Sequence, residues 1–236
     1  MGKFKLKLKN IPKYISFFAD LRRYKNMPEA ETILWKDLFP CMDERTSTTS
    51  FDTHYFYQDI WAFKKIFNTR AEQHVDVGSK VDYVGFLSAI THVTFIDIRP
   101  LVTDLPNFTG KAGSILEMPY PNDSILSLSC LHVAEHVGLG RYGDPMDPLG
   151  TINACKELQR VLAPGGNLYF GLPIGRPRVC FNAHRIHSPD QILSYFDSLK
   201  LVEFSLVNDQ GHFQENVPPE IGSHEKYGCG LFHFTK

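Results

Sequence analysis

The chain has 236 residues, of which 43% are hydrophobic and 22% charged, and its formal net charge is −1. This composition indicates one folded α/β domain with a small appendage. It excludes a disordered chain and a strongly basic nucleic-acid-binding protein. Residues 1–26 carry eight basic and one acidic side chain, which leaves 17 basic and 25 acidic side chains, or −8, for the remainder. We therefore predict a basic N-terminal arm and lead-in segment, residues 1–53, and a second domain, residues 54–236.

The five cysteines are odd in number and none is spaced C-x-x-C, so we expect neither a disulfide framework nor a structural zinc site. Reduced thiols are typical of a cytoplasmic protein. No apolar run approaches the roughly 20 residues that cross a bilayer. The first residues also lack the apolar core and cleavage site of a secretory signal. We expect a cytoplasmic protein.

Helix and strand patterns alternate along the second domain. The first helix is expected at residues 55–67, capped by Asp52 or Thr53, with one apolar face made of Phe56, Ile60, Phe63 and Phe67. Further helices are expected at residues 81–90, at residues 151–162 and from Ser188 onward. Strands are expected at residues 74–77, 93–98, 114–116, 125–129, 167–172, 201–207 and 231–234. This order predicts a Rossmann-like, doubly wound α/β fold. Its sheet is mostly parallel with an antiparallel edge strand, and an N-terminal helical extension precedes it.

Ligands of such sheets bind beyond the carboxyl ends of the strands. Gly78 follows the first strand, where a residue without a side chain lets a ligand approach the backbone. Asp97 ends the second strand and can accept hydrogen bonds from both hydroxyls of a ribose. The candidate cofactor-binding residues at these strand ends are Asp76, Gly78, Ser79, Asp97, Ile98, Ser114, Ile115, Leu116, Ser129, Cys130 and Leu131.

Three stretches at fixed spacing carry a resemblance to a known family. They read LEMPYPNDS at residues 116–124, SCLHVAEHV at residues 129–137 and ELQRVLAPGGNL at residues 157–168. In this order the chain resembles the class I S-adenosylmethionine-dependent methyltransferases over about residues 70–207. The strings YFYQD at residues 55–59 and FNAHR at residues 181–185 also resemble the DUF268 group.

The resemblance implies S-adenosylmethionine as the cofactor. Asp76, Gly78 and Ser79 would contact its methionine side, Asp97 its ribose, and residues 114–116 its adenine edge. The helix at residues 55–67 would cover the cofactor as a lid. Two departures favour an alternative, a methyltransferase-like protein that binds or scaffolds without catalysis. Lys80 and Asp82 stand where the family has further glycines, and Ser114 replaces an acid that often holds the adenine amine.

Methyl transfer to a hydroxyl requires an aligned acceptor and a group that takes its proton. We favour His184 as this base, with Arg185 and His132 as further catalytic candidates. Arg178 and His187 are expected to bind the acceptor, which we expect to be a sugar, a glycan or another small polyhydroxyl molecule. The competing interpretation is a surface loop with chance histidines. The turn-rich residues 144–147 either border the acceptor pocket or form only a loop.

His132, Glu135 and His136 also spell His-x-x-Glu-His, the motif of one class of zinc hydrolases. That interpretation requires a helix that presents both histidines on one face. We favour the methyltransferase interpretation, because the string directly follows a short parallel strand.

The basic residues of segment 1–26 predict a peripheral contact with an anionic membrane, at its inner face. The oligomeric state is not predicted.

Overall fold

The computed structural model describes residues 11–236 and divides the chain into two compact units. The first unit, Met1–Phe51, contains helix α1 (Ile11–Lys25) and the 3-10 turn η2 (Trp35–Asp37), and neither buries a residue. In residues 11–236 no helix is long and apolar enough to cross a membrane. Part of the predicted basic arm lies outside the described residues, namely Lys3, Lys5, Lys7 and Lys9.

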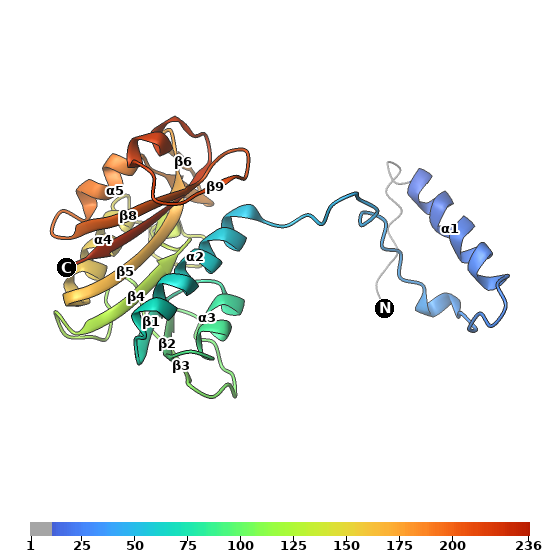
Figure 1. Cartoon of the computed structure of the whole chain (residues 1–236), viewed down its shortest axis with the longest axis horizontal. Helices are drawn as coiled ribbons and strands as arrows, with labels where there is room; N and C mark the ends of the chain where they lie inside the picture. The colour runs from blue at the N-terminus through green and yellow to red at the C-terminus, as the bar shows by residue number, and fades with distance from the viewer. Residues whose placement is uncertain (1–10) are drawn as a thin grey trace. The chain divides into compact units, whose positions relative to one another are not determined.

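The second unit, Asp52–Lys236, is built on an eight-stranded sheet in the order β3-β2-β1-β4-β5-β10-β8-β9 (Figure 1). The strands are β1 (Gln73–Val77), β2 (His92–Asp97), β3 (Phe108–Ala112), β4 (Ile125–Leu131), β5 (Leu162–Ile174), β8 (Lys200–Val207), β9 (Phe213–Gln214) and β10 (Gly228–Thr235). The first five pair in parallel, while β10 runs antiparallel between β5 and β8, and β9 forms an antiparallel edge. The predicted fold class is confirmed.

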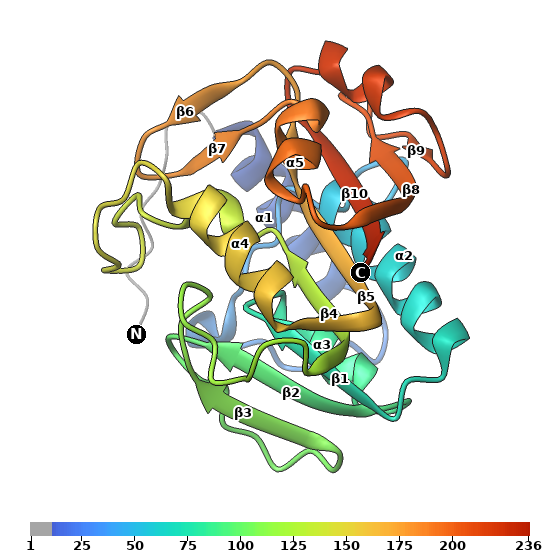
Figure 2. The ribbon, with the colours of Figure 1, turned by 90° about the vertical axis from the view of Figure 1, so that its left-hand side faces the viewer.

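Helices cover both faces of this sheet (Figure 2). One face packs against α2 (Thr53–Thr69) and α3 (Val81–Leu87), and the other against α4 (Gly150–Val161) and α5 (Pro189–Tyr195). Two 3-10 turns, η3 (Ala134–His136) and η4 (Pro219–His224), and a hairpin of β6 (Arg178–Cys180) and β7 (His184–Ile186) complete the unit.

The helix starts follow from local capping chemistry. Asp52 accepts hydrogen bonds from the backbone amides of His54 and Tyr55 at the start of α2. Ser188 and Gln191 form a reciprocal capping box at the start of α5. Each cap satisfies amide groups that the first helical turn leaves without partners.

The third strand is not where the sequence predicted it. Residues 114–116 form a turn, and β3 lies earlier, at Phe108–Ala112. This strand is at the edge of the sheet, bonded only to β2, and most of its side chains are exposed. An edge strand with so little burial needs no alternation of apolar residues, so the periodicity rule does not detect it.

The predicted apolar face of α2 is also wrong, although the helix itself is confirmed. The helix buries Gln58, Trp61, Ala62 and Ile66 against the sheet. Of the predicted apolar face, Phe56, Ile60 and Phe67 are 48%, 39% and 58% exposed, while Phe63 is half-buried and packs against the core. The helix therefore belongs to the core on one face of the sheet, and only its first turns approach the carboxyl edge.

Candidate functional site

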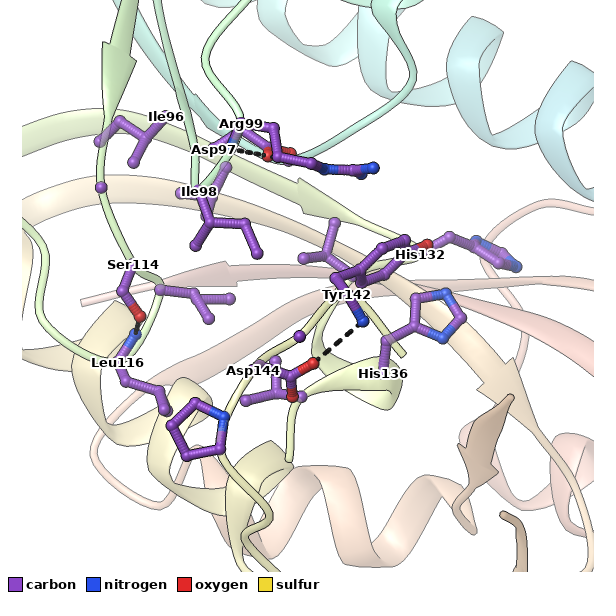
Figure 3. Close-up of a pocket in the computed structure, with 18 residues that line it drawn as sticks. Ile96, Asp97, Ile98, Arg99, Ser114, Leu116, His132, His136, Tyr142 and Asp144 are labelled. Carbon is purple, nitrogen blue, oxygen red and sulfur yellow. Dashed lines mark hydrogen bonds and ion pairs between the residues drawn. The ribbon is translucent and has the colours of Figure 1, made fainter. Parts of the chain in front are cut away.

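A cavity of about 400 Å³ opens at the carboxyl ends of β1, β2 and β4 (Figure 3). The strand order reverses between β1 and β4, which is the point where open α/β sheets bind ligands. Of the predicted cofactor-binding residues, six line the cavity: Gly78, Asp97, Ile98, Ser114, Ile115 and Leu116. None of its lining residues comes from α2, so the described residues do not support the predicted lid. The volume lies within the range of small-molecule sites.

Gly78 forms the floor of the cavity next to β1. Its φ of +66° is a conformation that residues with a side chain rarely adopt. A Cβ added there would lie 3.1 Å from Val133 Cγ1 and 3.5 Å from Asp97 Oδ2. The space in front of this backbone therefore exists only because residue 78 is glycine. Such a cradle fits a ligand that must approach the main chain closely.

Asp97 presents its carboxyl group across this space. Its Oδ1 accepts a hydrogen bond of 2.7 Å from the backbone amide of Arg99. Within the described part of the chain Oδ2 has no hydrogen-bond partner, and the side chain is 19% exposed. The carboxylate is thus held in place by one oxygen, with the other available to a ligand hydroxyl.

The segment 113–116 closes the opposite wall. The Leu116 amide donates to Ser114 Oγ at 3.1 Å, which fixes a tight turn (Figure 3). Gly113 lets this turn pack on β2, because a Cβ there would lie 2.8 Å from Ile96 Cγ2. Ile96, Ile98 and Leu116 present carbon atoms to the cavity, as a slot for a flat ring would require.

Asp76 and Ser129 lie beneath the cavity rather than in its wall. The buried Asp76 carboxylate accepts hydrogen bonds from the Ser79 amide, the Ser79 hydroxyl and the Ser129 hydroxyl. Burial raises the pKa of Asp76 to about 7, although these hydrogen bonds favour the charged form and lower the pKa. The prediction that Asp76, Ser79 and Ser129 contact the cofactor is therefore corrected, since together they hold the loop that carries Gly78.

The same network continues to a histidine that sequence reasoning missed. His74 Nε2 lies 2.8 Å from Ser129 Oγ, and His74 Nδ1 lies 2.8 Å from Ser127 Oγ. Because the Ser129 proton points to Asp76, Ser129 accepts from His74 Nε2–H, and Ser127 donates to Nδ1. Burial lowers the pKa of His74 to about 3, so the ring is neutral.

Cys130 and Leu131 also lie away from the cavity. Successive strand residues point to opposite faces, and Cys130 packs on the α4 side while Leu131 packs on the α2 side. Both side chains are buried in the core. Their predicted place in the cofactor wall is wrong for this reason.

The first residue beyond β4, His132, does line the cavity. It has a φ of +56°, which turns the chain sharply at the end of the strand. Its Nδ1 lies 2.6 Å from Gln58 Oε1 on α2, and its Nε2 is buried with no hydrogen-bond partner among residues 11–236. Burial lowers the pKa of His132 to about 3, so this ring is neutral as well.

Glu135 and His136 follow on the turn η3. Both carboxyl oxygens of Glu135 are buried, and in the described part of the chain neither has a hydrogen-bond partner. Burial raises the pKa of Glu135 to about 8. The ring of His136 lines the cavity, its Nδ1 donates to the Ala183 carbonyl, and its Nε2 lies 3.6 Å from Glu135 Oε1. Glu135 is therefore a neutral acid near pH 7 that sits behind the cavity wall.

The zinc-hydrolase interpretation of this string is not supported by the geometry. His132 precedes the turn in a left-handed conformation, and η3 spans only Ala134–His136. The two histidines are therefore not one turn apart on an α-helix, as the motif requires.

A loop after η3, residues 137–147, forms the remaining wall, and only its last four residues were expected near a pocket. Its base is pinned, since the Asp147 amide donates to the Gly138 carbonyl at 3.0 Å. At its tip the Tyr142 ring stacks with Arg99, whose guanidinium carbon lies 4.6 Å from the ring centre. Asp144 and Pro145, predicted to border a pocket or to form only a loop, do line the cavity.

Arg185 stabilises the base of this loop instead of facing a substrate. Its guanidinium donates to the backbone carbonyls of Val137 and Asp147, and the residue is buried. The prediction of Arg185 as a catalytic residue is corrected accordingly. The sequence does not indicate this role, because every residue has a backbone carbonyl and no residue type marks the ones that Arg185 binds.

The other predicted acceptor-side residues divide into two groups. His184 is half-buried, with its ring 6.5 Å from that of His136 and 5.2 Å from that of Tyr227. Burial, then Arg141 and Arg178, lower the pKa of His184. Arg178 is exposed. His184, Arg178 and His187 are all absent from the residues that line the cavity. His187 is buried against Tyr195, and among the described residues its Nε2 has no hydrogen-bond partner, so its predicted contact with the acceptor is wrong.

Together, the strand order, the glycine cradle after β1 and the acid at the end of β2 define a Rossmann-like domain with a candidate ligand site at the switch point of its sheet. A family model described as "Caenorhabditis protein of unknown function, DUF268" matches residues 120–210. This match includes the FNAHR string, and it covers less than half of the chain. A comparison with curated proteins gave no match.

Solved structures share the fold at low sequence identity. The chain is similar to the N-methyltransferase NodS from Bradyrhizobium japonicum WM9, in complex with S-adenosyl-L-homocysteine, at 14% identity and a TM-score of 0.52, over 92% of this chain and 96% of that one. It is similar to a putative sarcosine dimethylglycine methyltransferase from Galdieria sulphuraria at 16% identity and a TM-score of 0.55. That match covers 76% of this chain and 85% of the other. It is also similar to the [4+2]-cyclase SpnF at 14% identity and a TM-score of 0.53, over 75% of this chain and 81% of the other. The resemblance to class I methyltransferases is thus confirmed at the level of the fold.

Proposed function

We propose that the chain is an S-adenosylmethionine-dependent methyltransferase. The observation that carries this proposal is the cradle at Gly78, with the free Oδ2 of Asp97 facing it at the switch point of the sheet. A nucleoside ribose fits the carboxylate, a flat base fits the apolar slot at residues 114–116, and the amino-acid part fits the glycine backbone. The likeness in fold to NodS, which was solved with the demethylated cofactor product, supports the same placement.

When bound, this cofactor supplies an electrophilic methyl group, whose bond to sulfur breaks as the acceptor oxygen forms the new bond. The protein has to align the acceptor and take its proton. His184 is the proposed base. Its lowered pKa keeps the imidazole neutral near pH 7 and able to accept a proton, and it adjoins His136 at the cavity wall. Asp97 and the backbone at Gly78 hold the cofactor.

The proposed acceptor is the hydroxyl of a sugar, a glycan or another small polyhydroxyl molecule. Support comes from His184 and from Arg178, an exposed cation on the same hairpin. The proposed site of action is the cytoplasm. A peripheral membrane contact through segment 1–26 remains part of the proposal, since α1 ends in Arg22, Arg23 and Lys25 and has no buried residue.

A second candidate, a binding or scaffold protein without catalysis, is favoured by the loop after Gly78. Lys80 and Asp82 replace the family glycines, and their side chains pair with each other at 3.3 Å, both partly exposed. The likeness to a cyclase also shows that this fold hosts reactions other than methyl transfer.

Calorimetry with S-adenosylmethionine and S-adenosylhomocysteine separates the two candidates. The enzyme requires binding of both, and incorporation of labelled methyl groups into a metabolite or glycan extract would then identify the acceptor. Absence of binding at millimolar cofactor would refute the enzyme proposal. Binding without any incorporation would favour the scaffold.

A further inference from the structure

Three potential metal ligands from distant parts of the second unit meet beside the cavity. They are His54 in the first turn of α2, His132 beyond β4 and Cys229 at the start of β10. One ligand atom of each lies within 4.8 Å of the other two. Tetrahedral zinc with bonds of about 2.0–2.3 Å requires ligand atoms about 3.5 Å apart, so side-chain shifts of about 1 Å would complete the geometry.

The hydrogen bonding of His132 leaves one ring nitrogen ready to bind a metal ion. Gln58 Oε1 is an amide oxygen and can only accept, so His132 Nδ1 carries the proton. The Gln58 amide nitrogen donates to Asp59 at 3.2 Å, which agrees with this orientation. His132 Nε2 consequently carries an unprotonated lone pair, which is buried and meets no hydrogen-bond donor among the residues that the structure describes. A second residue that fixes the tautomer in this way is typical of histidine metal ligands.

Cys229 supplies the third ligand, and it forms no disulfide with the other described cysteines. Its residue is fully buried and its thiol is free. Aromatic rings lie beside the three ligands, since His54 stacks on Tyr227 at 5.2 Å and Tyr55 lies 5.0 Å from His132 between ring centres. A thiolate and two neutral imidazoles form a donor set that suits zinc better than calcium or magnesium.

We infer that His54, His132 and Cys229 form a binding site for one zinc ion at the edge of the cavity. Three protein ligands leave a fourth position open, as in catalytic rather than structural zinc sites. Because His132 also lines the cavity, the metal site adjoins the proposed active site. If the proposed function holds, the ion would bind the acceptor hydroxyl and lower its pKa, and the proton would pass to His184.

The site uses only one residue of the His-x-x-Glu-His string. The other two ligands are 78 and 97 positions away from His132 in the chain, which is why no spacing rule detects the set. The cysteine spacing argues against a zinc finger, but it does not address a site that contains one cysteine.

The test is cobalt and zinc titration of the full chain after removal of metal by a chelator. We expect one equivalent of Co²⁺ with the intense thiolate-to-metal absorption, displaced by one equivalent of Zn²⁺. Cys229→Ser should abolish the thiolate band, and His54→Gln should weaken binding at least tenfold. Gln58→Leu should weaken binding by about 10–100-fold, because the His132 tautomer is no longer fixed.

Matched controls are Cys41→Ser and His224→Gln, which change exposed residues and should bind as the wild type does. Circular dichroism of each variant excludes unfolding, and His54→Gln covers the case that Cys229→Ser does not fold. Failure of the wild type to bind Co²⁺, or an unchanged thiolate band in folded Cys229→Ser, would overturn the inference. Cobalt binding without S-adenosylmethionine binding would leave the metal site intact and refute the proposed function instead.

Discussion

The buried chain of hydrogen bonds from Asp76 to Ser127 makes a quantitative prediction about pH and stability. His74 has a pKa of about 3 in the folded protein, against 6.5 as its ordinary value. Between these values the unfolded chain binds a proton that the folded chain does not. The contribution of neutral His74 to the free energy of unfolding is therefore fully present above pH 6.5 and is lost as the pH falls toward 3.

From pH 8 to pH 5 this loss amounts to about 2 kcal/mol, since an unfolded histidine is almost fully protonated at pH 5 and buried His74 is not. Asp76 acts in the opposite direction. Its pKa is raised from 3.8 to about 7, so it contributes more stability as the pH falls through that interval. The wild-type curve alone therefore does not isolate His74. The difference between wild type and His74→Gln does.

The assay is urea unfolding at pH 8, 6.5 and 5. The chain has two tryptophans, and Trp61 is buried in the core of the second unit while Trp35 is exposed in the first. Trp61 fluorescence thus reports unfolding of the domain that contains His74. His92→Gln, an exposed substitution on neighbouring β2, is the control. Parallel pH curves for wild type and His74→Gln would show that His74 is not held neutral in this network.

Four further predictions concern the site and the arm. Asp97→Ala should weaken S-adenosylmethionine binding by tenfold or more in calorimetry, about 1.4 kcal/mol, and unchanged affinity would show that Asp97 does not hold the ribose. Gly78→Ala should destabilise the domain by about 1–2 kcal/mol in urea unfolding, because its φ of +66° is strained for alanine. It should also weaken cofactor binding, because the new methyl group would enter the cradle, and full affinity would contradict the role of that space. His184→Ala should lower turnover while cofactor affinity stays near the wild-type value, and normal turnover would assign the base to another residue. Deleting residues 1–26 should reduce sedimentation with anionic liposomes, and equal sedimentation would place any membrane contact elsewhere.

The sequence predicts those elements whose stability is decided locally. The cap of α2 at Asp52 and the start of α5 at Ser188 follow from short-range hydrogen bonds. The buried parallel strands follow from apolar, β-branched runs. The edge strand β3 and the buried face of α2 depend on contacts with distant segments. In α2, Gln58 takes a core position because its amide oxygen forms a hydrogen bond with His132, which lies beyond β4. The spacing of hydrophobic residues cannot predict such a polar partner.

The residues of the candidate site also fall into those that the sequence predicts and those that it does not. Gly78 and Asp97 could be placed because a fold rule assigns ligands to strand ends. Asp76 and Ser129 share those positions, yet they point below the loop toward Ser79 and His74. Strand position alone does not distinguish a side chain that faces a ligand from one that supports the loop. The wall at residues 137–147 has no periodic pattern, and only its glycines and prolines indicate a loop.

The wall formed by residues 137–147 has a consequence for the rate at which the cavity exchanges its contents. Its base is rigid, because a Cβ at Gly138 would lie 2.2 Å from the Asp147 carbonyl oxygen and Arg185 bonds both ends. At its tip the Tyr142 ring contacts both Arg99 and His136, and a cation–π pair at a partly exposed site is worth about 0.5–1 kcal/mol. Thermal motion overcomes an interaction of that size often, so the Tyr142 side chain can leave Arg99 while the base of the loop stays in place. Substitution of Tyr142 would then shorten the residence time of a bound ligand more than it would change the shape of the site.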